Sequence, residues 1–120
     1  MRSKLNGALF VVVTKEVYVD FLNGKKYELR RLERQWNKER VQPGRKVVVG
    51  CGYSGPRLWG TVGREIVVGS LWEIFHRVPF FAKIEPRARS RQEAIKLNQT
   101  LLGNSKQYIA FEIIFERAHA

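Results

Sequence analysis

The sequence predicts an α+β fold, built from one small curved sheet or barrel of about five to six strands with flanking helices. The first observation is length: 120 residues are near the commonest size of one domain, so we expect a single domain over residues 1–120. The second is the order of the predicted elements, which lacks the regular strand and helix alternation of a parallel doubly wound sheet. The third is glycine within a strand pattern, which is typical of bent strands.

The N-terminal elements are predicted from side-chain type and spacing. Residues 8–14, ALFVVVT, are β-branched and aromatic and too short for a buried helix, so they predict a strand. Residues 15–24, KEVYVDFLNG, place apolar side chains at helical spacing and end in Asn-Gly, a common helix C-terminus. Residues 27–32, YELRRL, predict a second strand, and residues 33–44 an irregular basic connection that closes with Pro-Gly.

The middle of the chain predicts two strands joined by a short turn. Residues 45–52, RKVVVGCG, predict a buried strand, and the following YSGPR predicts the turn. Residues 58–68, LWGTVGREIVV, predict another strand. Because glycine in a strand often marks a bulge, we expect this strand to bend near Gly60 or Gly63.

Two helices have clear starting signals near the C-terminus. The stretches that begin at Ser70 and Ser90 both match S-x-x-E, in which the serine and the glutamate each bind a free backbone amide of the first turn. The second helix is predicted to end at Gly103. Residues 107–115, QYIAFEIIF, predict the last strand.

Positive charge is the strongest signal in the composition. The chain has 22 Lys and Arg against 11 Asp and Glu, a net charge of +11. Nine of the bases and three of the acids lie between Lys25 and Lys46. Such an excess favours a polyanionic partner, of which nucleic acid is the commonest. The alternative is ordinary solvated charge, which serves solubility alone.

Other classes of protein are disfavoured by single features. The longest apolar run, Ala8 to Val13, is far shorter than the roughly 20 residues that span a bilayer, so we expect no membrane partner. No small-residue cleavage site follows it, and we expect a cytoplasmic protein. The lone Cys51 is expected to be a small core residue. With His76 and His119 as the only histidines there is no metal-ligand cluster, and we expect no metal and no cofactor.

Six short motifs, taken in order, resemble landmarks of the ASCH domain family. They are GKKYELR, VQPGRKVVVGCG, LWGTVGREIVV, SLWEIF, SRQEAI and YIAFEIIF, within about residues 8–116. The resemblance implies a PUA-like fold, which is a small β-barrel with helices at its side. It also implies a basic cleft beside the first motif.

The first motif departs from the family pattern by one deleted residue. The pattern is glycine, any residue, lysine, two residues, glutamate, any residue, arginine. Counted forward from Gly24 the lysine is Lys26, whereas counted back from Arg30 it is Lys25. Because side chains two residues apart share a face of a strand, alternation favours Lys26, on the face of Glu28 and Arg30.

This row of charges and the aromatic residues near it are the candidate binding residues. Lysine, glutamate and arginine in a row can hold a phosphate or a base edge, and the alternative is an exposed edge strand with paired charges. Aromatic side chains among bases can stack unpaired bases. Trp36 and Tyr53, in predicted loops, are expected to make such contacts, whereas Trp59, inside a strand pattern, is expected to pack in the core. The candidates for nucleic-acid binding are Lys25, Lys26, Glu28, Arg30, Arg31, Arg34, Trp36, Tyr53 and Arg57.

A second phosphate site is conceivable at the helix that begins after Ser90. Arg87, Arg89 and Arg91 surround this helix start, and a helix N-terminus attracts anions. The alternative, a solvated basic loop, is the more ordinary interpretation.

The sequence therefore supports two functions of different classes. The favoured one is a nucleic-acid-binding module, for RNA before DNA, that contacts phosphates through residues 25–46. The other is a small hydrolase with Lys26 and Glu28 as catalytic residues, because a desolvated lysine can act as nucleophile or base. Some ASCH-like proteins are similar to amidohydrolases of acylated nucleosides or to ribonucleases, although the threonine that accompanies their lysine is missing here. The ligand and the oligomeric state stay open.

Overall fold

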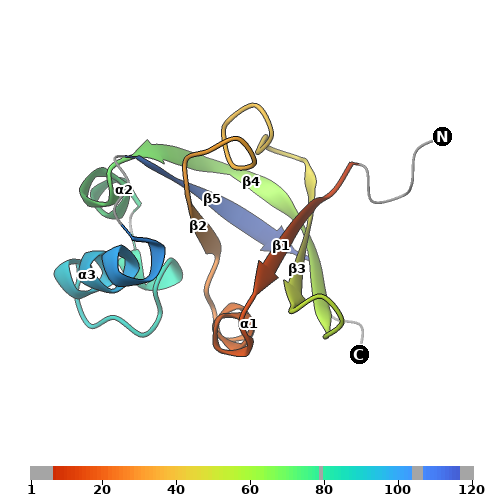
Figure 1. Ribbon diagram of the computed structural model, residues 1–120, viewed down its shortest axis with the longest axis horizontal. Coiled ribbons are helices and arrows are strands. Elements are labelled where there is room, and N and C mark those ends of the chain that lie inside the picture. Colours follow the sequence, from red (N-terminus) through yellow and green to blue (C-terminus); the bar gives the residue numbers. More distant parts are fainter. Residues whose placement is uncertain (1–6, 79, 104–106, 117–120) are drawn as a thin grey trace.

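The computed structural model describes residues 7–78, 80–103 and 107–116 (Figure 1). Its elements are β1 (Leu9–Val13), α1 (Lys15–Leu22), β2 (Tyr27–Arg31), β3 (Lys46–Cys51), β4 (Arg57–Gly69), α2 (Leu71–Arg77), the 3₁₀ turn η1 (Phe81–Lys83), α3 (Arg91–Leu102) and β5 (Tyr108–Phe115). Each predicted strand and helix has a counterpart, while the 3₁₀ turn was not predicted. His119 lies outside the described residues.

The five strands of the described chain form one mixed sheet in the order β1-β3-β4-β5-β2. β1 runs parallel to β3, and the other neighbouring strands are antiparallel. The sheet curls, so that its edge strands β1 and β2 both lie in front of β5 (Figure 1). The result is an α+β half-barrel with helices at its side, which confirms the predicted fold class. The barrel is open between β1 and β2.

The predicted bend lies in β4, the longest strand. Its pairing with β5 shifts register between Val62 and Ile66, around Gly63. Such irregularities bend a strand and increase its twist, which curls the sheet. Gly60 has a separate reason to be glycine, because a β-carbon there would lie 2.6 Å from the backbone oxygen of Ile114.

Local signals at the helix starts act as the sequence indicates. Ser70 and Glu73 form a complete capping box at α2, with hydrogen bonds of 3.0 and 3.1 Å. At α3, Ser90 Oγ accepts from the amide of Glu93 at 3.1 Å, but the Glu93 carboxylate accepts from the amide before Ser90 instead. Gly103 ends α3 with a φ of 73°, a conformation that favours glycine.

Two apolar clusters pack on opposite faces of the sheet. The inner cluster fills the curl and contains Val11, Val49 and Phe111. The outer cluster includes residues of α2 and α3, and it contains Ile74 and Ala110. Phe111 and Ala110 are neighbours on β5, so the alternation of one strand supplies both clusters.

Three burial expectations need correction. Trp36 is buried and stacks on Phe111 with ring centroids 5.9 Å apart, because backbone hydrogen bonds between Glu33 and Trp36 fold the β2–β3 loop back on the sheet. Trp59 is 42% exposed, because its neighbours in β4 face the inner cluster and it faces outward. Cys51 is half-buried at the end of β3 rather than fully in the core.

The sequence predicts no segment that spans a membrane. Within the described ranges, no helix is both long enough and apolar enough to cross a bilayer.

Candidate functional site

The turn between α1 and β2 brings a lysine into the protein interior. Gly24 has a φ of 113°, and the amide of Lys25 donates to the carbonyl of Asp20 at 2.9 Å. The Lys25 side chain is thereby buried, with its Nζ donating to the carbonyl of Ile84. The same ammonium lies 5.4 Å from the ring centroid of Phe21. Lys25 therefore joins the N-terminal half of the chain to the segment before α3.

Strand β2 places a glutamate and an arginine on the inner side of the half-barrel. Glu28 is buried, and its Oε2 accepts from Arg30 Nε at 2.5 Å. Arg30 Nη2 donates to the carbonyl of Val12 at 3.0 Å, so it spans the gap between the two edge strands β2 and β1. Its Cζ lies 4.9 Å from the ring centroid of Trp36. Arg30 is held on three sides and has little freedom to reorient.

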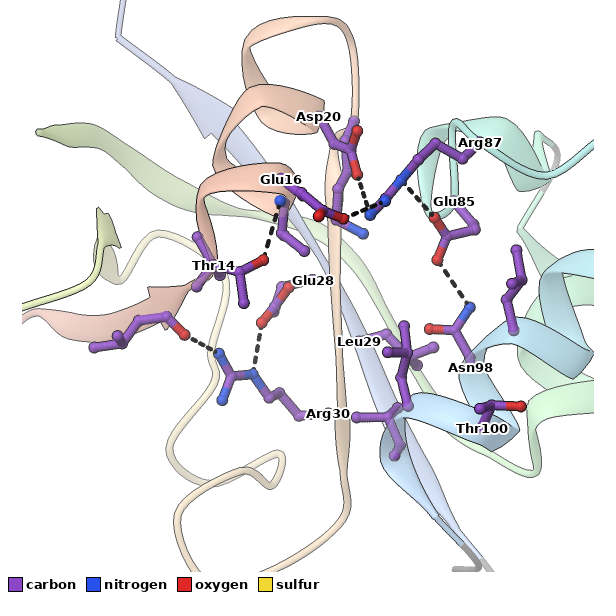
Figure 2. Close-up of a pocket in the computed structure, with 17 residues that line it drawn as sticks. Thr14, Glu16, Asp20, Glu28, Leu29, Arg30, Glu85, Arg87, Asn98 and Thr100 are labelled. Atoms are coloured by element: carbon purple, nitrogen blue, oxygen red, sulfur yellow. Dashed lines mark hydrogen bonds and ion pairs between the residues drawn. The ribbon is translucent and has the colours of Figure 1, made fainter. Parts of the chain in front are cut away.

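The opposite wall comes from the segment before α3 and from α3 itself. Glu85 and Asn98 are both buried, and Asn98 Nδ2 donates to Glu85 Oε1 at 3.2 Å and to the carbonyl of Ala94 at 2.8 Å. Arg87 connects this wall to α1, with ion pairs of 2.9 Å to Glu16 and 3.0 Å to Asp20 (Figure 2). These contacts fix the segment between η1 and α3 against α1.

One cavity of about 590 Å³ lies among these elements. The four buried polar side chains of the described residues all line it, and they are Lys25, Glu28, Glu85 and Asn98. We call it the seam cavity, because it lies at the gap between β1 and β2 (Figure 2). Buried polar side chains are costly unless they are paired, so their gathering in one hollow marks a candidate binding site.

The seam cavity is not a basic cleft. Its lining residues include four carboxylates, Glu16, Asp20, Glu28 and Glu85, and three cations, Lys25, Arg30 and Arg87. Burial lowers the pKa of Lys25 below its usual value, although Glu28, Glu85 and Asp20 oppose this shift. The cavity is therefore close to neutral in net charge, whereas the chain as a whole is strongly positive.

Lys25, and not Lys26, lines the cavity, which is contrary to the expectation from strand alternation. Lys26 is exposed and does not line the cavity, although Glu28 and Arg30 do. The reason is that β2 begins only at Tyr27, so the alternation of the strand does not extend back to the two lysines. The turn conformation at Gly24 sets their directions instead.

The remaining candidate residues are divided among three places. Arg31 is exposed and lines a second hollow of about 470 Å³, which shares Arg30 and the end of α3 with the seam cavity. Arg34 is exposed on the β2–β3 loop. Tyr53 and Arg57 lie apart from both hollows, at the β3–β4 turn, and do not line either of them.

Two of the three arginines near Ser90, Arg87 and Arg91, have side-chain partners within the protein. Arg87 is bound by carboxylates, and Arg91 Nε donates to the carbonyl of Phe75 at 2.9 Å. This arrangement gives no support to the second phosphate site.

Sequence reasoning missed the wall formed by Glu85 and Asn98. A signal was present for Asn98, because it lies four residues after Ala94 on the buried stripe of α3, where an apolar side chain is the ordinary choice. Nothing in the sequence pattern marks Glu85, since it lies in an irregular segment.

Solved structures share this architecture closely. The hypothetical protein PH0355 has a TM-score of 0.70 at 18% identity, and the match covers 91% of this chain and 99% of that chain. Protein PF0455 from Pyrococcus furiosus has a TM-score of 0.65 at 20% identity, covering 92% and 99%. The ASCH protein from Zymomonas mobilis has a TM-score of 0.62 at 12% identity, covering 90% and 67%. No family model and no curated protein matches the sequence significantly.

The half-barrel with helices at its side is consistent with a PUA-like barrel fold. More narrowly, its fold is of the ASCH type, as the motif resemblance implied. At these identities the likeness is one of fold.

Proposed function

We propose that the protein is a nucleic-acid-binding module, for RNA before DNA, that takes one unpaired base into the seam cavity while exposed cations contact the phosphates. The observation that carries this proposal is the gathering of four buried polar side chains in one cavity beside a cationic loop. An ASCH-type, PUA-like fold is compatible with such a role. Unpaired bases are the usual object of sequence-specific RNA recognition, which is why RNA is placed before DNA.

The lining of the cavity suits a base better than a phosphate. Four carboxylates would repel a phosphate, but Glu28 and Glu85 can accept hydrogen bonds from exocyclic amines. Arg30 can offer its remaining guanidinium donors to ring nitrogens and carbonyls, and the amide oxygen of Asn98 can accept from an amine, since both of its N–H groups are used within the protein. Apolar side chains, among them Val17 and Leu29, supply walls for the faces of a ring. The volume of about 590 Å³ lies within the range of small-molecule sites.

The phosphates would be contacted by exposed cations in the β2–β3 loop and on either side of it. These are Lys26, Arg31, Arg34, Lys38, Arg40 and Lys46. Phosphate contacts of this kind supply affinity and orientation without reading sequence. In this division of roles, the loop attracts the strand and the cavity selects the base.

A salt titration tests the electrostatic half of the proposal. With roughly five phosphate contacts, affinity for a mixed-sequence single-stranded RNA should fall with a log-log slope of about −3 to −5. Free nucleosides should compete with the RNA at one site, and their own binding should depend little on salt. A flat salt response by filter binding, or no competition by any nucleoside, would contradict the proposal.

A hydrolase is the second candidate, and one observation favours it. The pKa of Lys25 is lowered by burial beside Glu28, and a neutral amine in a cavity can act as a nucleophile or base. Because Lys26 is exposed, the lysine of this alternative would be Lys25. The contact of Lys25 Nζ with the carbonyl of Ile84 weighs against it, since that contact gives the lysine a structural role.

The isosteric substitution Glu28→Gln separates the two candidates. In a hydrolase it should lower turnover of an acylated nucleoside or of RNA by about 10²- to 10⁴-fold while substrate still binds. In a binding module there is no turnover to lose, and RNA binding should stay nearly equal, because the glutamine side-chain oxygen can still accept from an exocyclic amine of the base.

A further inference from the structure

A second aromatic and cationic surface lies on the outer side of β1, β3 and β4. The strand register places Phe10 beside Val48, and Val48 beside Trp59, on one face. The intervening residues Leu9 and Val11 belong to the inner cluster, so Phe10 points outward. Trp59 is 42% exposed on the same face. We call this face the outer platform.

The ring of Phe10 on the outer platform contacts both an arginine and a second aromatic ring. Arg57 Cζ lies 5.0 Å from the ring centroid of Phe10, and Tyr53 meets Phe10 edge to face with centroids 6.5 Å apart. Tyr53 is 81% exposed, the largest value among the exposed large apolar or aromatic side chains of the described residues. An exposed tyrosine that no core requires is available to pack against something else.

A glycine makes room for this arrangement. A β-carbon at Gly50 would lie 2.7 Å from Cε1 of Phe10, so the Phe10 ring lies over the place where a side chain would stand. Gly50 is paired with Val12 on one side and with Arg57 on the other. The ring therefore lies over Gly50, with the guanidinium of Arg57 close to it.

Charge distinguishes the outer platform from the seam cavity. The residues that the register places on this face are Phe10, Val12, Lys46, Val48, Gly50, Arg57, Trp59 and Thr61. They include two cations and no carboxylate, whereas the cavity lining holds four carboxylates. Aromatic rings with cations and without acids complement a single-stranded nucleic acid, whose bases stack and whose phosphates are negative.

The two surfaces are adjacent. Val12 lines the seam cavity and lies in the same row as Gly50 and Arg57, so two strand spacings, about 10 Å, separate the backbones of Val12 and Arg57. The amide of Gly52 donates to the carbonyl of Val13 at 3.1 Å, which ties the start of the turn that carries Tyr53 to a residue that lines the cavity. A strand with one base in the cavity has its flanking nucleotides within reach of the rings.

We infer that the outer platform is a stacking site for a nucleobase that flanks the base held in the seam cavity. This inference rests on the proposed function and deepens it, because it makes the ligand a single strand of several nucleotides rather than one nucleotide. Tyr53 supplies the free ring face, Phe10 supports it, and Arg57 binds the adjoining phosphate or stacks on the base.

The test compares Tyr53→Ala with Trp72→Ala as a matched control. Trp72 is also strongly exposed, 62%, but it lies on α2, which is far from β1 in the molecule (Figure 1). The probes are a labelled six-nucleotide single-stranded RNA and the same strand with only one base left and abasic residues elsewhere. Binding is measured by fluorescence anisotropy.

Tyr53→Ala should weaken binding of the full strand by about 5- to 150-fold and leave the single-base strand unaffected, as loss of one stacked base predicts. Tyr53→Phe should restore binding, and Trp72→Ala should change neither probe. Because Tyr53 is exposed, its removal should leave the melting temperature unchanged.

Equal binding of the full strand by wild type and Tyr53→Ala would overturn the inference, and a steep salt slope in the same titration would leave the proposed function standing. No binding of either strand by wild type would overturn both. Sedimentation velocity could give a third result, in which wild type is a dimer and Tyr53→Ala is a monomer. This result would mean that the outer platform binds a second copy of the chain, and it would also overturn the stacking site.

Discussion

The seam cavity and the β2–β3 loop meet at Arg30, and they differ in the burial and pairing of their charged side chains. In the cavity, Lys25, Glu28 and Glu85 are buried, and each is paired with a carbonyl, a guanidinium or an amide. In residues 31–46, six bases outnumber two acids, and most of the bases are exposed. Net charge therefore indicates that a polyanion binds but not where a ligand is selected. Selection of one ligand requires polar side chains that are paired with one another, because only paired side chains are held in one geometry.

The largest effect on RNA affinity is expected when the positive charges of the β2–β3 loop, and not those elsewhere on the chain, are removed. Changing Arg31, Arg34, Lys38 and Arg40 to glutamine should weaken RNA binding by roughly 10²-fold at physiological salt, because four phosphate contacts are lost. The log-log salt slope should become shallower by about 3. Filter binding over a salt series measures both quantities.

The control removes the same net charge elsewhere. Lys15, Arg64, Arg77 and Lys96 are exposed and lie on other elements, so their change to glutamine should have a much smaller effect. If the two quadruple variants lose equal affinity, only net charge matters and the comparison between loop and cavity fails.

The second prediction addresses the buried network of the cavity. Asn98→Ala should lower the free energy of unfolding by about 1–3 kcal/mol, because the buried carboxylate of Glu85 loses its amide donor. Gln99→Ala, exposed on the same helix, should stay close to wild type. Urea unfolding measures the difference, and the salt slope for RNA should not change in either variant. Equal stability of the two variants would mean that the network contributes nothing.

The third prediction uses the lowered pKa of Lys25. Since the folded-state pKa lies below that of the unfolded chain, about 10.4, unfolding takes up a proton at pH values between the two. The free energy of unfolding therefore rises with pH across this window and is lowest where the lysine is charged in both states. Relative to Lys25→Met, which lacks this titration, wild type should become more stable as pH rises towards 10. The free energy of unfolding of Lys26→Met, measured by urea at each pH, should change with pH as that of wild type does. If the free energy of unfolding of Lys25→Met changed with pH in the same way, the burial effect would be contradicted.

The smallest effect is expected at Lys26. As one exposed cation it can neutralise one phosphate, so Lys26→Met should weaken RNA binding by roughly fourfold at physiological salt without changing the melting temperature. Anisotropy titrations resolve a change of this size. A loss of 100-fold or more would show that Lys26 does more than attract phosphate, and the two lysines would have to be reassigned.

Much of the fold could be predicted because its signals are local. The capping box at Ser70, the end of α1 at Asn23 and the β-branched run of β3 are each determined by neighbouring residues. The parallel pairing of β1 with β3 could not be predicted, because register between distant strands leaves no local pattern.

The candidate site was predictable only in part, for the same reason. Glu28 and Arg30 share a face of one strand, and alternation is sufficient to place them together. Alternation favoured Lys26 over Lys25, and this was wrong because a turn, not a strand, directs the two lysines. Glu85 and Asn98 approach from segments far away in the sequence, and only tertiary packing brings them to the cavity.

The contact between Lys25 Nζ and the carbonyl of Ile84 joins residues 59 positions apart, and the edge strand β2 pairs with β5, the last strand along the described chain. Contacts of such long range form late, because the entropy of closing the loop must be lost before they are made. During synthesis, the cationic loop emerges well before α3 and β5 exist to complete the cavity. We therefore expect a nascent or truncated chain to attract nucleic acid by charge while it still lacks the cavity that would discriminate among bases.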